Sequence, residues 1–213
     1  MGEDADLSPV FVDTFSDQAV ARADDHAGRI ADIKRMSGRT RGGAIANFIF
    51  GGLTPPVTVT ATATVTVTHS IILGNQAIGG AGTTGGNGQG GGIANLNGGI
   101  LTVSNSLIAL NRAIGGEGDG GNGGNGGNGQ GGGIFNGGAI PIGPSRLTLQ
   151  RSLIALNQAD GGASVGGNAG LGQGGGLYLA PGGMASADRW TLIFANDAST
   201  SDDDVFGILV LVR

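Results

Sequence analysis

The chain has no cysteine and few aromatic residues or prolines. The absence of cysteine from its 213 residues excludes disulfides, thiolate zinc sites and cysteine nucleophiles. Aromatic residues make up 4% of the chain and hydrophobic residues 39%, so any core is aliphatic and thin. The 47 glycines far outnumber the 6 prolines and follow no strict three-residue period, which argues against a collagen helix.

Basic residues are also scarce. The chain has 11 Lys and Arg against 16 Asp and Glu, a formal net charge of -5, and the basic residues are scattered. We therefore expect neither nucleic acid nor an anionic membrane as a partner. No segment approaches the roughly 20 apolar residues of a membrane-spanning helix, so we expect no membrane insertion. The start, MGEDADLSPV, lacks a basic region followed by an apolar run, and we identify no signal peptide there.

Two short phrases recur along the chain in a fixed order. The phrase GGAI ends at Ile45, and GGGI or GGGL ends at Ile93, Ile134 and Leu177, at spacings of 48, 41 and 43 residues. Each is followed by a second phrase, SIILGN, SLIALN, SLIALN or TLIFAN, which ends at Asn75, Asn111, Asn157 and Asn196 respectively. Two phrases repeated four times indicate a stacked repeat architecture.

Strands are predicted at both phrases and between them. The segments 57–68, 101–105 and 147–151 alternate Val or Leu with Thr, Ser or Gln, which is the period of a half-buried strand. Aligning the units on the serine of the second phrase predicts three inward rows and one outward row. The inward rows are Val65–Leu101–Leu147, Val67–Val103–Leu149 and Ile72–Ile108–Ile154–Ile193, and the outward row is Thr66–Thr102–Thr148.

The four asparagines that close the second phrase are predicted to form a structural column. An Asn at one place in every unit suits a turn, because Asn tolerates the left-handed region and its amide can bond the amide one unit away. Three short strands per unit, returning to the start, describe a coil of a parallel β-helix. The sequence therefore predicts an all-β solenoid of about four coils with glycine-rich corner loops.

Glycine is concentrated in three tracts, 79–92, 115–133 and 161–176, which we interpret as excursions from one corner of the coils. Free glycine loses the most backbone entropy on ordering, which favours flexible loops. The alternative is that neighbouring tracts pack side by side into a glycine-rich layer.

The N-terminal part lacks the repeat. Residues 17–36 place Val20, Ala23, Ala27, Ile30 and Ile33 on one face of an amphipathic helix. An exposed solenoid end needs covering, so we predict a capping helix within residues 1–40 and a β-helix domain over 41–213.

With these residues in view, the chain resembles right-handed parallel β-helix repeat proteins of bacterial surfaces and secretions. It is similar to the repeat region of the chlamydial polymorphic outer membrane proteins, whose motifs are GGA-[ILV] and FxxN. Here GGAI stands at Gly42–Ile45, and Ile replaces Phe in the second motif, as in Ile72–Asn75. The resemblance implies a right-handed helix, a surface or extracellular location and an adhesive or structural role.

Residues for catalysis are not evident. The ionisable residues inside the units do not recur at one register, although Arg151 and Asp188 can approach each other on adjacent coils as a surface pair. His26 and His69 lack spaced partners, and the acidic run at 202–204 is interpreted as surface. We therefore predict no catalytic residues, no metal site and no cofactor.

The predicted function is a non-enzymatic structural or adhesive module, with a surface glycan or another protein as partner. The alternative is a carbohydrate-active β-helix that binds or degrades polysaccharide. A lesser alternative is ice binding through an outward threonine face. That face comprises Thr58, Thr60, Thr62, Thr64, Thr66, Thr68, Thr102 and Thr148.

Overall fold

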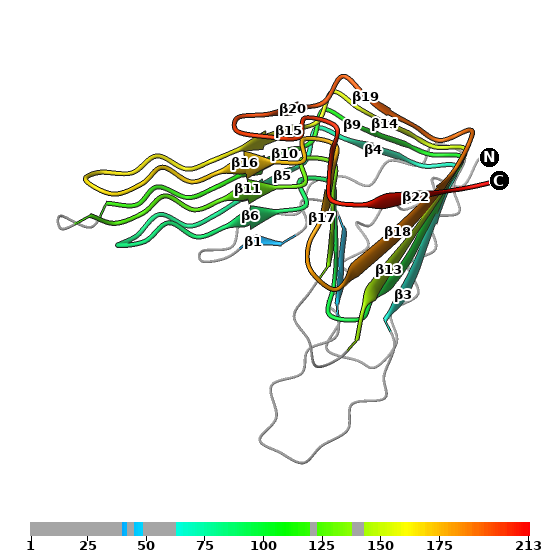
Figure 1. Cartoon of the computed structure of the whole chain (residues 1–213), viewed down its shortest axis with the longest axis horizontal. Helices are drawn as coiled ribbons and strands as arrows, with labels where there is room; N and C mark the ends of the chain where they lie inside the picture. Colours follow the sequence, from blue (N-terminus) through cyan, green and yellow to red (C-terminus); the bar gives the residue numbers. More distant parts are fainter. Residues whose placement is uncertain (1–39, 42–44, 49–62, 120–122, 138–142) are drawn as a thin grey trace, which may run out of the picture.

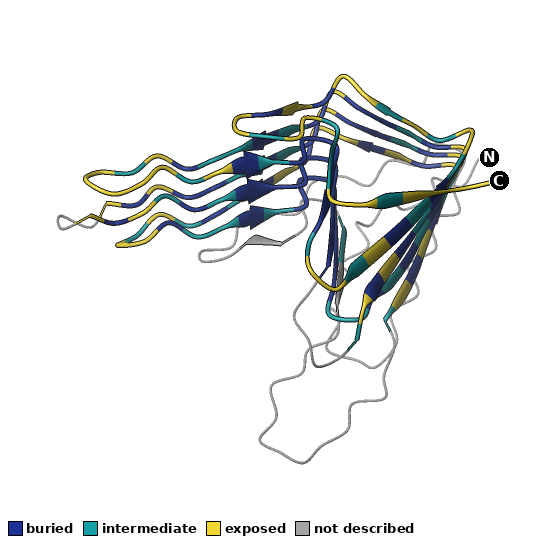
Figure 2. Cartoon of the chain, in the orientation of Figure 1, coloured by how far each residue is buried: buried dark blue, intermediate teal, exposed yellow. Residues whose placement is uncertain are grey.

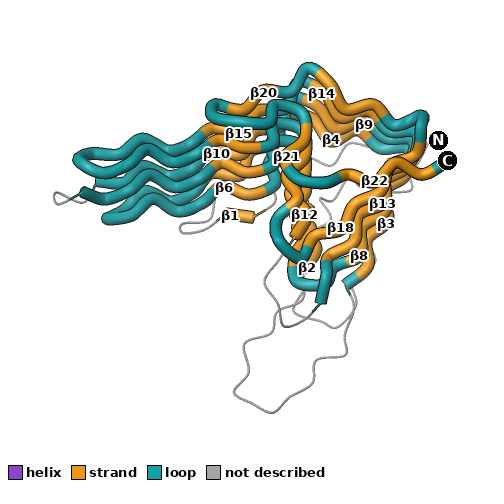
Figure 3. The backbone as a smooth tube through the Cα atoms, viewed as in Figure 1, coloured by secondary structure: helices purple, strands orange, loops and turns teal. Residues whose placement is uncertain are grey.

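The computed structural model describes residues 40–41, 45–48, 63–119, 123–137 and 143–213. Within them the chain forms strands, turns and loops and no helix (Figure 3). Every pair of adjacent strands is parallel, and the strands are stacked in five sheets (Figure 1). The all-β class and the parallel stacking predicted from the repeat are thus confirmed, and the arrangement is consistent with a β-helix or solenoid.

Each sheet collects one kind of strand from successive units, and we name the sheets by their residues. The Gln sheet contains β1 (Thr40–Arg41), β6 (Gly88–Gln89), β11 (Gly129–Gln130) and β16 (Gly172–Gln173). The aromatic sheet contains β2 (Ile45–Phe48), β7 (Ile93–Leu96), β12 (Ile134–Gly137), β17 (Leu177–Leu179) and β21 (Val205–Phe206). The Thr sheet contains β3 (Thr64–Thr68), β8 (Ile100–Ser104), β13 (Ser145–Gln150), β18 (Gly183–Asp188) and β22 (Leu209–Val212).

The other two sheets come from the second phrase and the residues after it. The Leu sheet contains β4 (Ile71–Leu73), β9 (Leu107–Ala109), β14 (Leu153–Ala155) and β19 (Leu192–Phe194). The Ala sheet contains β5 (Gln76–Ile78), β10 (Arg112–Ile114), β15 (Gln158–Asp160) and β20 (Asp197–Ala198). The chain visits the Gln, aromatic, Thr, Leu and Ala sheets in this order before the next glycine tract. Each unit therefore has five strands where the sequence predicted three.

The predicted rows form the core. Leu147 pairs with Leu101, and Leu101 with Val65, while Ile154 pairs with Ile108. All members of the three inward rows are buried except the last, Ile193, which is partly buried and packs against them. Figure 2 shows the same alternation of buried and more exposed residues along the strands. The row predictions are confirmed, since parallel in-register pairing places like residues above one another.

The asparagines of the second phrase form a buried, directional ladder. Asn75 donates from its backbone N–H (2.9 Å) and its Nδ2 (3.0 Å) to Oδ1 of Asn111. Asn111 donates in the same way to Asn157, and Asn157 to Asn196. Asn196 then donates to Oδ1 of Asp204.

The turn beside this ladder differs from its prediction in one detail. The left-handed backbone lies one residue before each asparagine, at Gly74 (φ 70), Leu110 (φ 56), Leu156 (φ 58) and Ala195 (φ 55). The asparagines are thus selected for their paired amide bonds, and the preceding residue turns the chain.

The glycine tracts pack against one another and project from the sheets as a layered blade, at the left in Figure 1. One hydrogen-bond chain crosses the blade: Gly170 N–H to Gly162 O, Gly162 to Gly127, Gly127 to Gly116, Gly116 to Gly86 and Gly86 to Gly80, at 2.8 to 2.9 Å. A Cβ on Gly116 would overlap the carbonyl of Gly80. Interpreting these tracts as flexible loops was therefore wrong, because ordering is offset by backbone bonds that only glycine lets approach so closely.

A second apolar cluster lies on the aromatic sheet. Tyr178 stacks between Phe135 and Phe206, with ring centroids 5.4 and 4.6 Å apart. Burial raises the pKa of Tyr178, and a hydrogen bond with the Gln130 side chain opposes that shift in part. The predicted capping helix within residues 1–40 and the segment 57–62 of the first long strand lie outside the described residues.

Candidate ligand-binding groove

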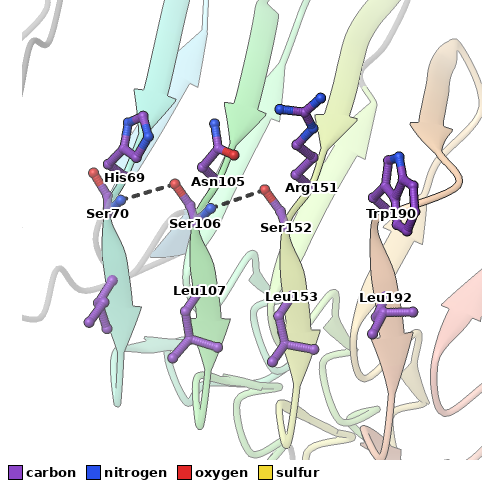
Figure 4. A pocket seen from close by; sticks show the side chains of 11 residues that line it. His69, Ser70, Asn105, Ser106, Leu107, Arg151, Ser152, Leu153, Trp190 and Leu192 are labelled. Atoms are coloured by element: carbon purple, nitrogen blue, oxygen red, sulfur yellow. Dashed lines mark hydrogen bonds between the residues drawn. The ribbon is translucent and has the colours of Figure 1, made fainter.

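The corner between the Thr and Leu sheets carries a row of outward side chains. His69, Asn105 and Arg151 each have left-handed backbone, with φ of 49°, 48° and 46°. Because each directly precedes the serine of the second phrase, the same turn recurs in each unit and aims the three side chains alike. Trp190 continues this row in the next unit, as Figure 4 shows.

Serines form the floor below this row. Ser70 N–H donates to Ser106 Oγ (3.1 Å), and Ser106 N–H donates to Ser152 Oγ (3.3 Å), as dashed in Figure 4. Each Oγ donates its own proton to the carbonyl two residues earlier at 2.8 Å. All three hydroxyls are buried and donate, and those of Ser106 and Ser152 also accept, so they build the corner and are not free nucleophiles.

Aliphatic side chains form the opposite wall. Ile71, Leu107, Leu153 and Leu192 stack at one register of the Leu sheet. Between this wall and the polar row runs an open, shallow groove of about 560 Å³ that crosses the strands. A ligand lying in it would meet a similar aliphatic side chain in each unit and a different side chain on the opposite wall.

Arg151 and Asp188 do approach each other at the end of this groove, but through the backbone. The Asp188 carboxylate accepts from the backbone N–H of Arg151 (3.1 and 3.2 Å), from Trp190 N–H (3.1 Å) and from the Thr191 hydroxyl (2.8 Å). Desolvation would raise the pKa of Asp188, but the hydrogen bonds from Arg151, Thr191 and Trp190 outweigh it and hold that pKa below its usual range. A carboxylate held ionised in this way is a poor general acid.

Other charged side chains also have structural partners. Arg112 Nη2 binds Asp160 Oδ2 at 2.9 Å, an ion pair between adjacent strands of the Ala sheet. In the acidic run, Asp203 accepts from Ala198 N–H and Asp204 from Asn196. Within the described ranges, no three His, Asp or Glu side chains come together as metal ligands.

The predicted threonine face is narrower than the sequence suggested. Thr66, Thr102 and Thr148 stack in register and are followed by Ser186 and then Val210. A mixed row lies on each side of this threonine row. One consists of Thr64, Ile100, Arg146 and Met184, and the other of Thr68, Ser104, Gln150 and Asp188. Thr58, Thr60 and Thr62 lie outside the described residues. In the described part of the face, one threonine row thus stands between two mixed rows.

The outer surface of the Leu sheet is apolar. Its outward positions in all four strands are Ile71, Leu73, Leu107, Ala109, Leu153, Ala155, Leu192 and Phe194, of which Ala109 and Ala155 are buried, at 6% and 5% exposure. Leu110 and Leu156 extend this surface at the next corner, and we call the ten residues the Leu face. Six of them are about half exposed, from 45% at Ile71 to 56% at Leu156 and Leu192.

Sequence reasoning missed the groove and the Leu face. The residue before each serine varies from His to Asn to Arg, so it looked like an unrelated spacer. The signal was available in the second phrase itself, because SLIAL has apolar residues at consecutive positions and a strand can bury only alternate ones.

Comparison of the chain with protein-family models, with curated proteins and with solved structures finds no match. In the part of the chain that the structure describes, no helix has the length and apolar character of a membrane span.

Proposed function

We propose that this chain is a non-enzymatic structural or adhesive module of a bacterial surface or secreted protein. Its framework is a right-handed parallel β-helix of about four coils, with an N-terminal helical cap within residues 1–40. The module acts through its surface, without a cofactor, and its partner is a surface glycan or another protein. The resemblance to bacterial β-helix repeat proteins supports the handedness and the location.

The groove beside the Leu sheet carries this proposal. One wall is a row of aliphatic residues, the other is formed by His69, Asn105, Arg151 and Trp190, and serines lie on the floor. The carboxylate at its end, Asp188, accepts hydrogen bonds from three residues and has a lowered pKa. Acid and base catalysis needs paired groups with pKa values matched to proton transfer. An open groove that crosses several units, with the nearby Asp188 carboxylate held in hydrogen bonds, suits contact with an extended ligand better than turnover.

A glycan-array screen of the purified chain, with turnover of every bound glycan assayed in the same wells, tests the proposal. Binding without turnover is expected for an adhesive module. Arg151→Gln removes the charge that lines the groove and should weaken that binding. Arg146→Gln makes the same change on the Thr sheet and should not. Turnover of a glycan would overturn the non-enzymatic proposal. If no glycan on the array binds, the remaining partner under this proposal is another protein.

The second candidate is a carbohydrate-active β-helix. The observation in its favour is the meeting of Trp190, Arg151 and Asp188 at one end of the groove, where an indole could stack on a sugar. The Arg189 guanidinium lies 4.6 Å from the Trp190 ring centroid and steadies it. If the array detects turnover, Asp188→Asn should abolish it under this candidate.

A further inference from the structure

The Leu face lacks any charged side chain. All eight outward positions of its four strands are apolar, and Leu110 and Leu156 add two more. The four strands of the Leu sheet are already hydrogen-bonded to one another in parallel ladders. A partner that packs on this face therefore forms no new backbone hydrogen bonds with the groups between these strands. Contact with this face is therefore stabilised by burial of apolar surface.

The extent of the face suits a stable interface. A half-exposed side chain of this size leaves roughly 100 Å² in water, so the six most exposed residues present roughly 600 Å². This is at the upper end of the largest apolar patches on monomers. With the rim included, it approaches the roughly 800 Å² that each partner buries in a standard protein interface.

We propose that the Leu face is the interface of a two-fold symmetric homodimer, which goes beyond the proposed function. The side chains on the face stand in straight rows repeated at the strand spacing of about 4.8 Å. Rows of this kind interdigitate with rows of the same spacing, and a second copy supplies such rows. A two-fold axis places the same patch on both sides, as in most homo-oligomers.

Charge restricts where a second copy can dock. Each chain carries a formal charge of -5, so two copies repel over much of their surfaces and can approach closely only where the surface is neutral. His69, Asn105 and Arg151 border the face on one side, and Arg112 with Asp160 on the other. An apolar centre within a polar rim is the anatomy of protein interfaces. In the dimer the second copy covers the aliphatic wall of the groove, so a second copy and a ligand in the groove compete for this wall.

Sedimentation equilibrium of the full chain, over concentrations from about 1 to 100 µM, tests the dimer. Leu73→Lys puts two charges into the two-fold interface and should raise the dimer dissociation constant at least about tenfold. Met184→Lys makes a similar change at a side chain that is also half exposed, but on the Thr sheet, and should leave the constant unchanged. Both positions are exposed, and far-ultraviolet circular dichroism should show the wild-type fold in both variants.

A wild-type chain that stays monomeric over this range overturns the proposal. So does a dimer that Leu73→Lys leaves intact, or an assembly that grows beyond two copies. Because the chain lacks cysteine, a single cysteine at Leu156 or at Met184 can carry a spin label. A short distance between labels of two chains is expected for Leu156→Cys and not for Met184→Cys, and the reverse result would place the interface on another sheet. No glycan enters these measurements, so their outcome is independent of the array.

Discussion

Asn111→Ala should lower the free energy of unfolding by a large amount for the loss of one small side chain. Asn111 is fully buried, and its Oδ1 accepts from the backbone N–H and the Nδ2 of Asn75. Its Nδ2 donates to the carbonyl of Ile72 and to Oδ1 of Asn157. Alanine removes the Asn111 acceptor from both Asn75 donors, of which Nδ2 keeps its 3.3 Å bond to the Leu73 carbonyl, and removes the Asn111 donor from the Ile72 carbonyl. Each buried donor or acceptor that loses its partner lowers the free energy of unfolding by about 1 to 3 kcal/mol. Because the structure relaxes in part, we expect a total loss of about 3 to 5 kcal/mol.

Urea unfolding followed by far-ultraviolet circular dichroism measures this loss of unfolding free energy. Asn168→Ala is the matched control, because Asn168 is exposed and bonds its neighbours through its backbone, so a change within about 0.5 kcal/mol is expected. Hydrogen exchange should show the loss of protection at the Leu sheet corners first. A loss below about 1 kcal/mol for Asn111→Ala, or a loss equal to that of the control, would refute the view that the ladder is a major source of stability.

Two further predictions concern the blade and the aromatic stack. Gly116→Ala pushes a Cβ into the Gly80 carbonyl and should cost about 1 to 3 kcal/mol with loss of amide protection in the blade. Gly82→Ala finds its nearest atom at 3.7 Å and should keep that protection, so equal protection in both variants would contradict the packed blade. Tyr178, the single tyrosine, has a pKa raised above 10.0, so its contribution to stability is complete below about pH 10 and is lost as pH rises through the folded pKa. Tyrosinate absorbance should therefore appear above pH 10 in the native chain, and titration at the ordinary value with the fold intact would contradict its burial.

The rows of the core were predictable because two repeated residues of the second phrase, its serine and its asparagine, both set the register of the units. The serine and asparagine of the second phrase bracket Ile108 and Ile154, and parallel pairing then stacks every residue between them. The two-residue strands of the Gln sheet were not predictable, since no period exists in two residues. They are fixed by the partner unit, as in the pairing of Gln130 with Gln89 and Gln173.

The glycine tracts show why local propensity failed. An isolated glycine segment gains little from ordering, and the sequence of one tract gives no reason to expect order. Order comes from the tracts of neighbouring units. Their backbones pass within hydrogen-bonding distance of one another because Gly86, Gly116 and Gly127 have no side chains to keep them apart. The groove was missed for a related reason, since it is a property of three stacked corners and not of one.

The acidic residues near the C-terminal end have a physical explanation in the direction of the ladders. Each Asn in the column donates to the next and accepts from the one before, so the last asparagine, Asn196, needs a partner that only accepts. Asp204 supplies it with a carboxylate that takes both donors. The serine ladder ends similarly, because Ser152 N–H donates to the Thr191 hydroxyl, which donates to Asp188. Two independent ladders thus end on aspartate. The carboxylates of Asp188 and Asp204 are therefore occupied in holding the last unit together.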